Sequence, residues 1–303
     1  MRSVVNYEAN CAMNRFMQVD VFGTKPYMGN PVAVVFDADK VSDNEMQAIA
    51  RWTNLAETTF IQTATRDEAD YRIRIFDTQT ELPFAGHPSI GTAHAAIEAG
   101  LVDSTTTTIV QQCGAGLIRL TVEGEGSDRR IYVTGPKPIL KALPPQEEQV
   151  FASSLGLSSN EASSPMIVDV GARWLTFELS SENEVRDRLP NLKAVVDVCE
   201  KYSLTGVTTY AISDSEQYQV CLRAFAPTGW SVEEDPVCGS GNICVAAHLS
   251  HSGRLQIVGN QYVANQGRDM GRDGQVSVLV SEGGDAITVG GTAVTCISGQ
   301  IEV

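Results

Sequence analysis

The chain has 303 residues, of which 43% are hydrophobic and 19% charged, and a formal net charge of −15. This composition is globular and leaves room for two domains of about 150 residues each. The acidic balance argues against nucleic-acid binding, which needs basic patches. No apolar run reaches the roughly 18 residues of a membrane span, and residues 1–10 lack the apolar core of a signal peptide. We therefore expect a cytoplasmic protein with no membrane or nucleic-acid partner.

The first half of the chain alternates strands with two helices. Residues 1–13 precede the first strand as an extension. A helix is predicted from Asp43 to Trp52, because Ser42 and Glu45 form a capping box. A second helix over 88–99 ends at Gly100. β-branched and alternating residues predict the strands, which cover 15–22, 32–36, 58–61, 70–76, 105–111, 116–122 and 130–133.

A Pro-rich stretch over 135–145 predicts a linker to a second half with the same plan. Short helices are expected over 184–191 and 192–200, and a longer one runs from Gly241 to about His251. The remaining segments are predicted strands, which cover 171–177, 210–212, 218–225, 276–280, 286–289 and 293–303.

One turn occurs twice. It reads Glu-Leu-Pro-Phe-Ala-Gly-His-Pro-Ser over 81–89 and Glu-Asp-Pro-Val-Cys-Gly-Ser-Gly-Asn over 234–242. Each copy follows an Arg-x-Phe strand and leads into an Ala-rich helix. The repeat predicts two similar halves that face one another, with the chemistry in the cleft between them.

Both turns place glycine at the start of a helix. Free N–H groups there, together with the helix dipole, favour an anion, and glycine lets a ligand approach the backbone. The two matched turns therefore predict a binding site for a small carboxylate. The residues concerned are Gly86, His87 and Pro88 in the first turn and Gly239, Ser240 and Gly241 in the second.

Three titratable side chains are candidates for chemistry. His87 at a helix start should have a lowered pKa and act as a neutral hydrogen-bond donor. Glu57 is either solvated at a strand start or held in an apolar cleft, where desolvation would raise its pKa toward neutrality. Asp235 is either an ordinary turn residue or an acid that faces Glu57. The other histidines have no matched acidic ligands, so no metal site is predicted.

Five motifs in order resemble the phenazine-biosynthesis PhzF-like family. They lie at 19–22, 29–35, 54–60, 81–88 and 234–241. The resemblance implies a diaminopimelate-epimerase-like α+β fold, with two pseudo-symmetric domains, each a curved, mostly antiparallel sheet around a central helix. It implies an N-terminal half over 1–136 and a C-terminal half over 137–291, with the last strand, about 292–303, packed on the first. It also implies a homodimer without a cofactor, and an active site between the domains.

The resemblance also assigns roles. Glu57 matches the proton-shuttling carboxylate, Asp235 its partner in proton relay, and His87 a first-turn contact. Three departures stand out: Asp77-Thr78 replaces the Thr-Pro often seen, Cys238 stands where the family commonly has Thr, and residues 1–13 have no counterpart. Related epimerases carry a Cys in each half, but the partner position here is Ala85. A thiol at a helix start should have a lowered pKa.

Three functions follow as hypotheses. The first is a cofactor-independent isomerase, as in secondary metabolism, that moves a proton on an amino-acid-like or cyclic hydroxy acid. The second is an amino-acid epimerase or racemase that uses Glu57 and Cys238. The third is a binding protein for small acids that has kept the cleft without catalysis.

Overall fold

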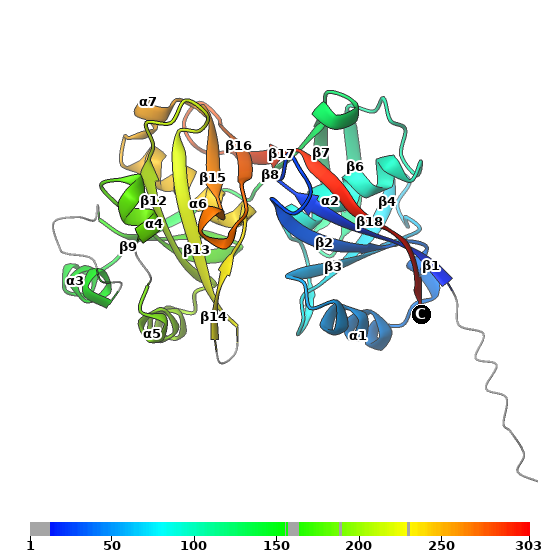
Figure 1. Ribbon diagram of the computed structural model, residues 1–303, viewed down its shortest axis with the longest axis horizontal. Coiled ribbons are helices and arrows are strands. Elements are labelled where there is room, and N and C mark those ends of the chain that lie inside the picture. The colour runs from blue at the N-terminus through cyan, green and yellow to red at the C-terminus, as the bar shows by residue number, and fades with distance from the viewer. Residues whose placement is uncertain (1–12, 155, 157–163, 188–189, 229–230) are drawn as a thin grey trace, which may run out of the picture.

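The computed structural model describes residues 13–154, 156, 164–187, 190–228 and 231–303, so residues 1–12 of the expected extension lie outside the described residues. Figure 1 shows two lobes side by side, each with strands around a helix. The strands are β1 (Met13–Val21), β2 (Asn30–Val35), β3 (Glu57–Gln62), β4 (Tyr71–Phe76), β5 (Glu81–Leu82), β6 (Thr108–Cys113), β7 (Gly116–Glu123), β8 (Arg130–Thr134), β9 (Ile139–Ala142), β10 (Met166–Val170), β11 (Ala172–Glu178), β12 (Gly206–Ile212), β13 (Val220–Thr228), β14 (Ser231–Asp235), β15 (Gln261–Gln266), β16 (Gly274–Val280), β17 (Ile287–Gly291) and β18 (Ala293–Glu302). The helices are α1 (Asp43–Thr53), α2 (Gly86–Glu98), α3 (Pro145–Ser154), α4 (Glu182–Asp187), α5 (Leu192–Tyr202), α6 (Gly239–His251) and α7 (Leu255–Val258).

The two halves repeat one pattern of strand pairing. In the first, β2 pairs with β3 and β4 with β6 in parallel. In the second, β11 pairs with β12 and β13 with β15 in parallel. The other pairings are antiparallel, which confirms the predicted α+β fold with two pseudo-symmetric, mostly antiparallel sheets.

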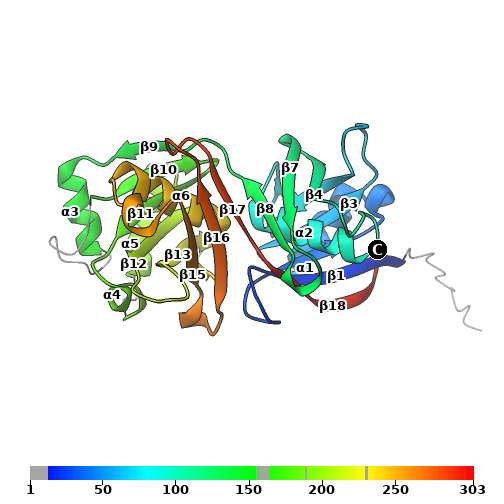
Figure 2. The ribbon, with the colours of Figure 1, turned by 90° about the horizontal axis from the view of Figure 1, so that it is seen from above.

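A buried helix lies at the centre of each sheet (Figure 2). Every residue of α2 from His87 to Ile97 is buried, as is every residue of α6 from Gly241 to Leu249. A helix that is apolar or small on all faces belongs in a core. Gly91 shows the tightness of this packing, because a Cβ there would lie 2.4 Å from the Val32 side chain.

The lobes exchange strands. β8 pairs with β17, and β18 crosses to pair with β1 along nine positions from Met13 to Val21. β9 in turn pairs with β10. Figure 1 shows β18 lying along β1, although the two strands come from opposite ends of the chain. The predicted domain boundary near residue 136 stays a prediction, because strand pairing alone does not define where one domain ends and the next begins.

The structure corrects two local predictions. The stretch over 135–145 is not a plain linker, because β9 lies within it and its backbone hydrogen-bonds to β10 despite the flanking prolines. α2 and α6 begin two residues earlier than predicted, so Pro88 is the third helical residue, not the first. The capping box of Ser42 and Glu45 is confirmed. None of the helices in the described ranges has the length and apolar character of a membrane span.

Candidate active site

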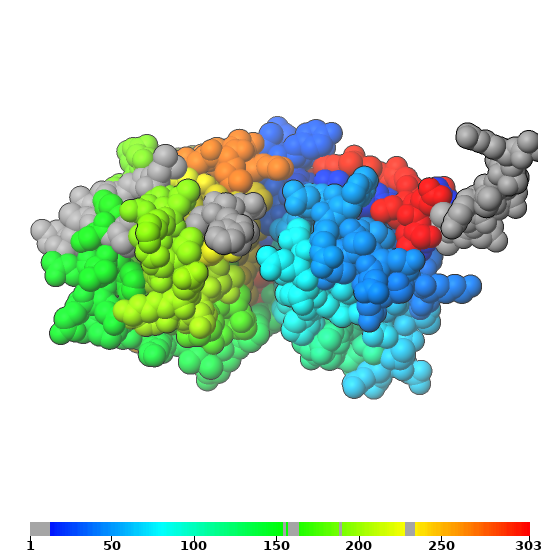
Figure 3. Space-filling view, turned by 90° about the horizontal axis from the view of Figure 1, so that it is seen from below, coloured from blue at the N-terminus to red at the C-terminus, as the bar shows by residue number. Residues whose placement is uncertain are grey.

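The starts of the two central helices face each other across the boundary between the lobes. A Cβ built on Gly239 would lie 3.9 Å from the backbone nitrogen of His87. The N-cap of α2, Ala85, has no side-chain hydrogen bond to the helix. First-turn amides have no partner within their own helix, so N–H groups of α2 remain to bind an anion. Figure 3 shows a hollow in the surface where the two lobes meet.

Glu57 lies at the first paired position of β3, opposite Val32 of β2. Its side chain is 17% exposed, and Oε2 is buried without a hydrogen-bond partner among the described residues. Burial raises the pKa of Glu57 to about 7, and the nearby Asp77 carboxylate adds to the rise. Of the two alternatives left open by the sequence, the desolvated carboxyl group with a raised pKa therefore describes Glu57.

His87 lies at the second position of α2, with Nδ1 3.2 Å from Glu57 Oε2. Burial lowers the pKa of His87 to about 4, against the charges of Asp235 and Asp20 and a backbone hydrogen bond with Pro31. The imidazole is therefore neutral at physiological pH, as predicted, but burial is the largest cause. Its Nε2 has no hydrogen-bond partner within the described ranges.

Asp235 reaches the same place from the other lobe, at the end of β14. Burial raises its pKa to about 6; the charge of His87 lowers it and that of Glu57 raises it. Its Oδ1 accepts the Val237 amide at 3.0 Å, which is the turn interaction weighed from the sequence. The turn interpretation of Asp235 is confirmed, since one oxygen shapes the turn; the charges of His87 and Glu57 also act on this carboxylate, and its role as an acid stays a prediction.

Cys238 differs from its prediction. The thiol caps α6 by accepting the Gly241 amide at 3.2 Å and lies 3.5 Å from Ser240 Oγ. The predicted fall in its pKa is wrong. Burial, with the negative charge of Asp235, raises the pKa of Cys238 well above its usual value. Desolvation of the thiolate outweighs the helix dipole here.

Three side chains that the sequence analysis did not select support the second turn. Trp174 Nε1 donates to Ser240 Oγ at 3.0 Å. Gln266 accepts the Cys238 amide at 3.0 Å and donates to the Asp235 carbonyl at 2.7 Å. Asn30, from the other lobe, donates to Asp235 Oδ1 at 3.0 Å. Asn30 lies in the 29–35 motif of the resemblance, which assigns it no role of its own.

The structure thus brings the candidate residues of both turns together with Glu57. Glu57, His87 and Gly86 come from the N-terminal lobe, and Asp235 and the start of α6 from the C-terminal lobe. Pro88 and Gly241 are the third residues of α2 and α6, and both are buried. A group with a pKa near 7 between two helix starts can exchange a proton with a bound carboxylate compound.

Comparison with known proteins gives the family. Residues 19–299 match the family described as "Phenazine biosynthesis-like protein". Antisense-enhancing sequence 1 of Schizosaccharomyces pombe is 40% identical, over 94% of this chain and 97% of that protein. The uncharacterized isomerase YddE of Escherichia coli K12 is 31% identical, over 91% and 94%.

Solved structures show the same fold. The PhzF-family protein of Bacillus anthracis superimposes with a TM-score of 0.83 at 23% identity, over 96% of this chain and all of that one. A hydroxyproline epimerase of Agrobacterium vitis gives 0.64 at 15% identity, over 95% and 91%. The epimerase-like fold expected from the resemblance is confirmed, and the chain belongs to the phenazine biosynthesis-like protein family.

Proposed function

We propose that this protein is a cofactor-independent isomerase that moves a proton on a small carboxylate-bearing metabolite, with Glu57 as the acid–base group. One observation carries the proposal: Oε2 of Glu57 lies 3.2 Å from the neutral imidazole of His87. This oxygen is buried without a hydrogen-bond partner among the described residues, and the pKa of the side chain is about 7. A general base is most effective when its pKa is near the working pH. The isomerase name of the YddE relative agrees with this class of reaction.

The helix starts would orient the substrate. Amide N–H groups of α2 and α6 would bind its carboxylate, with the neutral imidazole of His87 beside them. Ionised Glu57 would then remove a proton from a carbon next to a double bond or carbonyl group. The C–H electron pair enters the conjugated system, and protonated Glu57 returns the proton to a different carbon.

Asp235 would be the second acid–base group. Its pKa of about 6 lies below that of Glu57, so near pH 6.5 one of the two carboxyls can hold a proton while the other is ionised. Buried carboxyls with separated pKa values are a common arrangement for acid–base pairs. The two residues approach the site from opposite lobes, which suits proton transfer at two positions of one ligand.

Glu57→Gln tests the proposal. A panel of cyclic unsaturated hydroxy acids and amino acids is incubated with the protein in D₂O and followed by ¹H NMR. We expect a shifted double bond with deuterium incorporation for one member, and a loss of about 10³-fold or more in the variant. Circular dichroism and carboxylate binding should stay unchanged. Turnover near the wild-type level in Glu57→Gln would refute the role of Glu57.

An epimerase that uses Glu57 and Cys238 is the second candidate. The thiol favours it, because Cys238 caps α6 beside Ser240 and next to Asp235. The raised pKa of the thiol and the alanine at the matching position 85 count against it.

Cys238→Ser separates the two candidates. An isomerase that depends on Glu57 and Asp235 should keep activity within about tenfold, whereas an epimerase would lose about 10²-fold or more. The product gives a second readout, since inversion at a deuterated α-carbon would identify an epimerase. Tight binding of a small acid with no exchange for any compound would instead support a non-catalytic binding protein.

A further inference from the structure

Asn30 links the two lobes at the candidate site. It is the first residue of β2 and is 1% exposed. Its Nδ2 donates to Asp235 Oδ1 at 3.0 Å and to the Val237 carbonyl at 3.1 Å. The two acceptors lie 205 and 207 residues further along the chain, in the other lobe. One buried amide group therefore uses both of its N–H donors across the boundary.

The chemistry of the acceptors fixes the orientation of this amide. A backbone carbonyl and an ionised carboxylate only accept hydrogen bonds, so the NH₂ end must face them. Oδ1 of Asn30 is then buried without a partner among the described residues. An unpaired buried acceptor is unfavourable for stability, so the value of this side chain lies in its contacts with Asp235 and Val237.

The backbone that carries Asn30 is held firmly. The Gly29 amide donates to the buried carboxylate of Asp20 at 2.7 Å. A Cβ at Gly29 would lie 2.1 Å from the Val21 carbonyl, so no larger residue fits. Pro31 follows and restricts the chain further. Asn30 therefore projects from a turn with little freedom to move.

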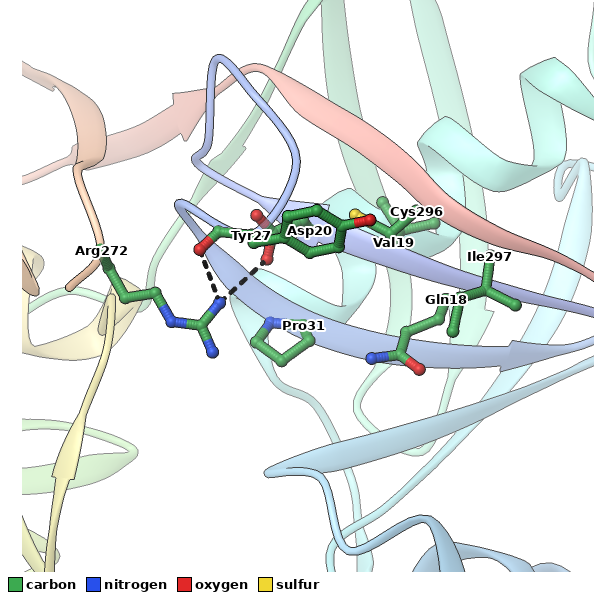
Figure 4. Close-up of a pocket in the computed structure, with 8 residues that line it drawn as sticks. All are labelled: Gln18, Val19, Asp20, Tyr27, Pro31, Arg272, Cys296 and Ile297. Atoms are coloured by element: carbon green, nitrogen blue, oxygen red, sulfur yellow. Dashed lines mark hydrogen bonds and ion pairs between the residues drawn. The ribbon is translucent and has the colours of Figure 1, made fainter. Parts of the chain in front are cut away.

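The other side of this turn is also fastened to the C-terminal lobe. A cavity of about 210 Å³ there is lined by Asp20, Tyr27, Pro31 and Arg272, among others. Figure 4 shows Arg272 reaching toward Tyr27 and Asp20. Its guanidinium donates to the Tyr27 carbonyl at 2.9 Å and lies 3.9 Å from Asp20 Oδ1. Arg272 and Asp20 are already paired, so they join the lobes at this cavity.

The same turn also reaches His87. The imidazole of His87 forms a hydrogen bond with the Pro31 backbone. Because proline has no N–H group, the imidazole must be the donor and the carbonyl the acceptor. Neighbouring residues of one rigid turn thus contact the His87 and Asp235 side chains, which come from different lobes.

We propose that Asn30 is a positioning residue: from the N-terminal lobe it holds the Asp235 carboxylate of the C-terminal lobe in place against Glu57 and His87. The inference rests on the proposed function in which Asp235 is the second acid–base group. Asn30 acts through Asp235 and takes no part in proton transfer.

The proposal predicts how Asp235 titrates. The titratable groups that face it are His87 from α2, Glu57 from β3 and Cys238 at the start of α6. A hydrogen bond to an ionised carboxylate favours the ionised form. Without the Asn30 donor, Asp235 should therefore bind its proton more tightly, and its titration midpoint should rise.

The experiment is a ¹³C NMR titration of the aspartate carboxyl groups in the full chain, with Asp235→Asn to assign the signal. In Asn30→Ala we expect the midpoint of Asp235 to rise by at least about half a pH unit. Asn14→Ala is the matched control: Asn14 is 6% exposed and donates to the Phe36 and Asp37 carbonyls at 2.8 and 3.0 Å. It should leave the Asp235 midpoint unchanged.

An unchanged midpoint in folded Asn30→Ala would overturn the proposal. If that variant does not fold, the isosteric Asn30→Asp takes its place; the extra carboxylate should raise the midpoint further, and an unchanged value would again refute the proposal. This readout needs no turnover. Failure of the proposed acid–base role of Asp235 would instead appear as wild-type activity in Asp235→Asn.

Discussion

The two strand–turn–helix units share an Arg–Glu ion pair, here called the frame of the turn, but bury it to different depths. In the first, Arg74 of β4 forms a two-pronged ion pair with Glu81. In the second, Arg223 of β13 does the same with Glu234. The side chains of the first pair are 15% and 41% exposed, and those of the second 4% and 12%. The frame thus supports a turn in either environment.

The units also divide the chemistry between them. The first paired position of β3 carries Glu57, opposite Val32, and that of β12 carries Gly206, opposite Trp174. A Cβ at Gly206 would lie 2.5 Å from the Trp174 ring. The indole therefore occupies the space of a second carboxylate and supports Ser240. Two halves with the same pattern of strand pairing thus form an asymmetric site.

Removal of the two arginines should give the largest difference between the units. Arg223→Met should cost about 3–5 kcal/mol in the free energy of unfolding, because it leaves Glu234, which is only 12% exposed, without its cation. Arg74→Met should cost about 1 kcal/mol or less, since water can reach its partners. Urea unfolding of both variants measures the difference. Equal losses in the free energy of unfolding would show that depth of burial does not distinguish the two Arg–Glu ion pairs.

A side chain at position 206 should be the next most damaging change. The Cβ of Gly206→Ala would lie 2.3 Å from the Phe225 carbonyl oxygen as well as against Trp174. We expect a loss of about 2–3 kcal/mol in thermal or urea unfolding. Gly299→Ala in β18 is the control, because nothing lies within 4 Å of its Cβ, and it should stay within about 0.5 kcal/mol. A neutral Gly206→Ala would mean that the second half can accept a side chain where the first has Glu57.

Glu57 should lower stability at neutral pH. Its pKa in the folded protein is about 7, above the usual 4.5. The folded protein is therefore most stable below about pH 4.5, where Glu57 is protonated, and it loses this stability as the pH rises through 7 and the buried carboxyl ionises. Glu57→Gln should therefore be more stable than the wild type at pH 8, by about 1–3 kcal/mol, and by less at pH 5. Unfolding at both pH values tests this. The exposed Glu123→Gln is the control, and a gain that does not depend on pH would contradict the argument.

The sequence was most informative where local chemistry decides structure. The Ser42 capping box and the two Ala-rich helices could be predicted from spacing alone. The charge state of Cys238 could not, because it depends on how far the whole fold removes the thiol from water. β9 was missed because its pairing with β10 is a long-range backbone contact, while its own residues suggest a loop.

The site shows the same limit. Repetition of the turn pointed to Gly86, His87, Gly239 and Ser240, and resemblance pointed to Glu57 and Asp235. The contact between Asn30 and Asp235 spans 205 residues, so no local pattern contains it. The sequence places Trp174 only on a strand, since its role depends on Gly206 having no side chain where the indole lies.

The pairing of β18 with β1 has a consequence during protein synthesis. β1 is among the first described segments to leave the ribosome, yet its partner ends at residue 302. Domains usually fold as units, with the N-terminal one first. Here the sheet that carries Glu57 and His87 cannot be completed until the other lobe has been translated. A chain released early therefore exposes the edge of β1, and the proposed acid–base site forms only in a finished molecule.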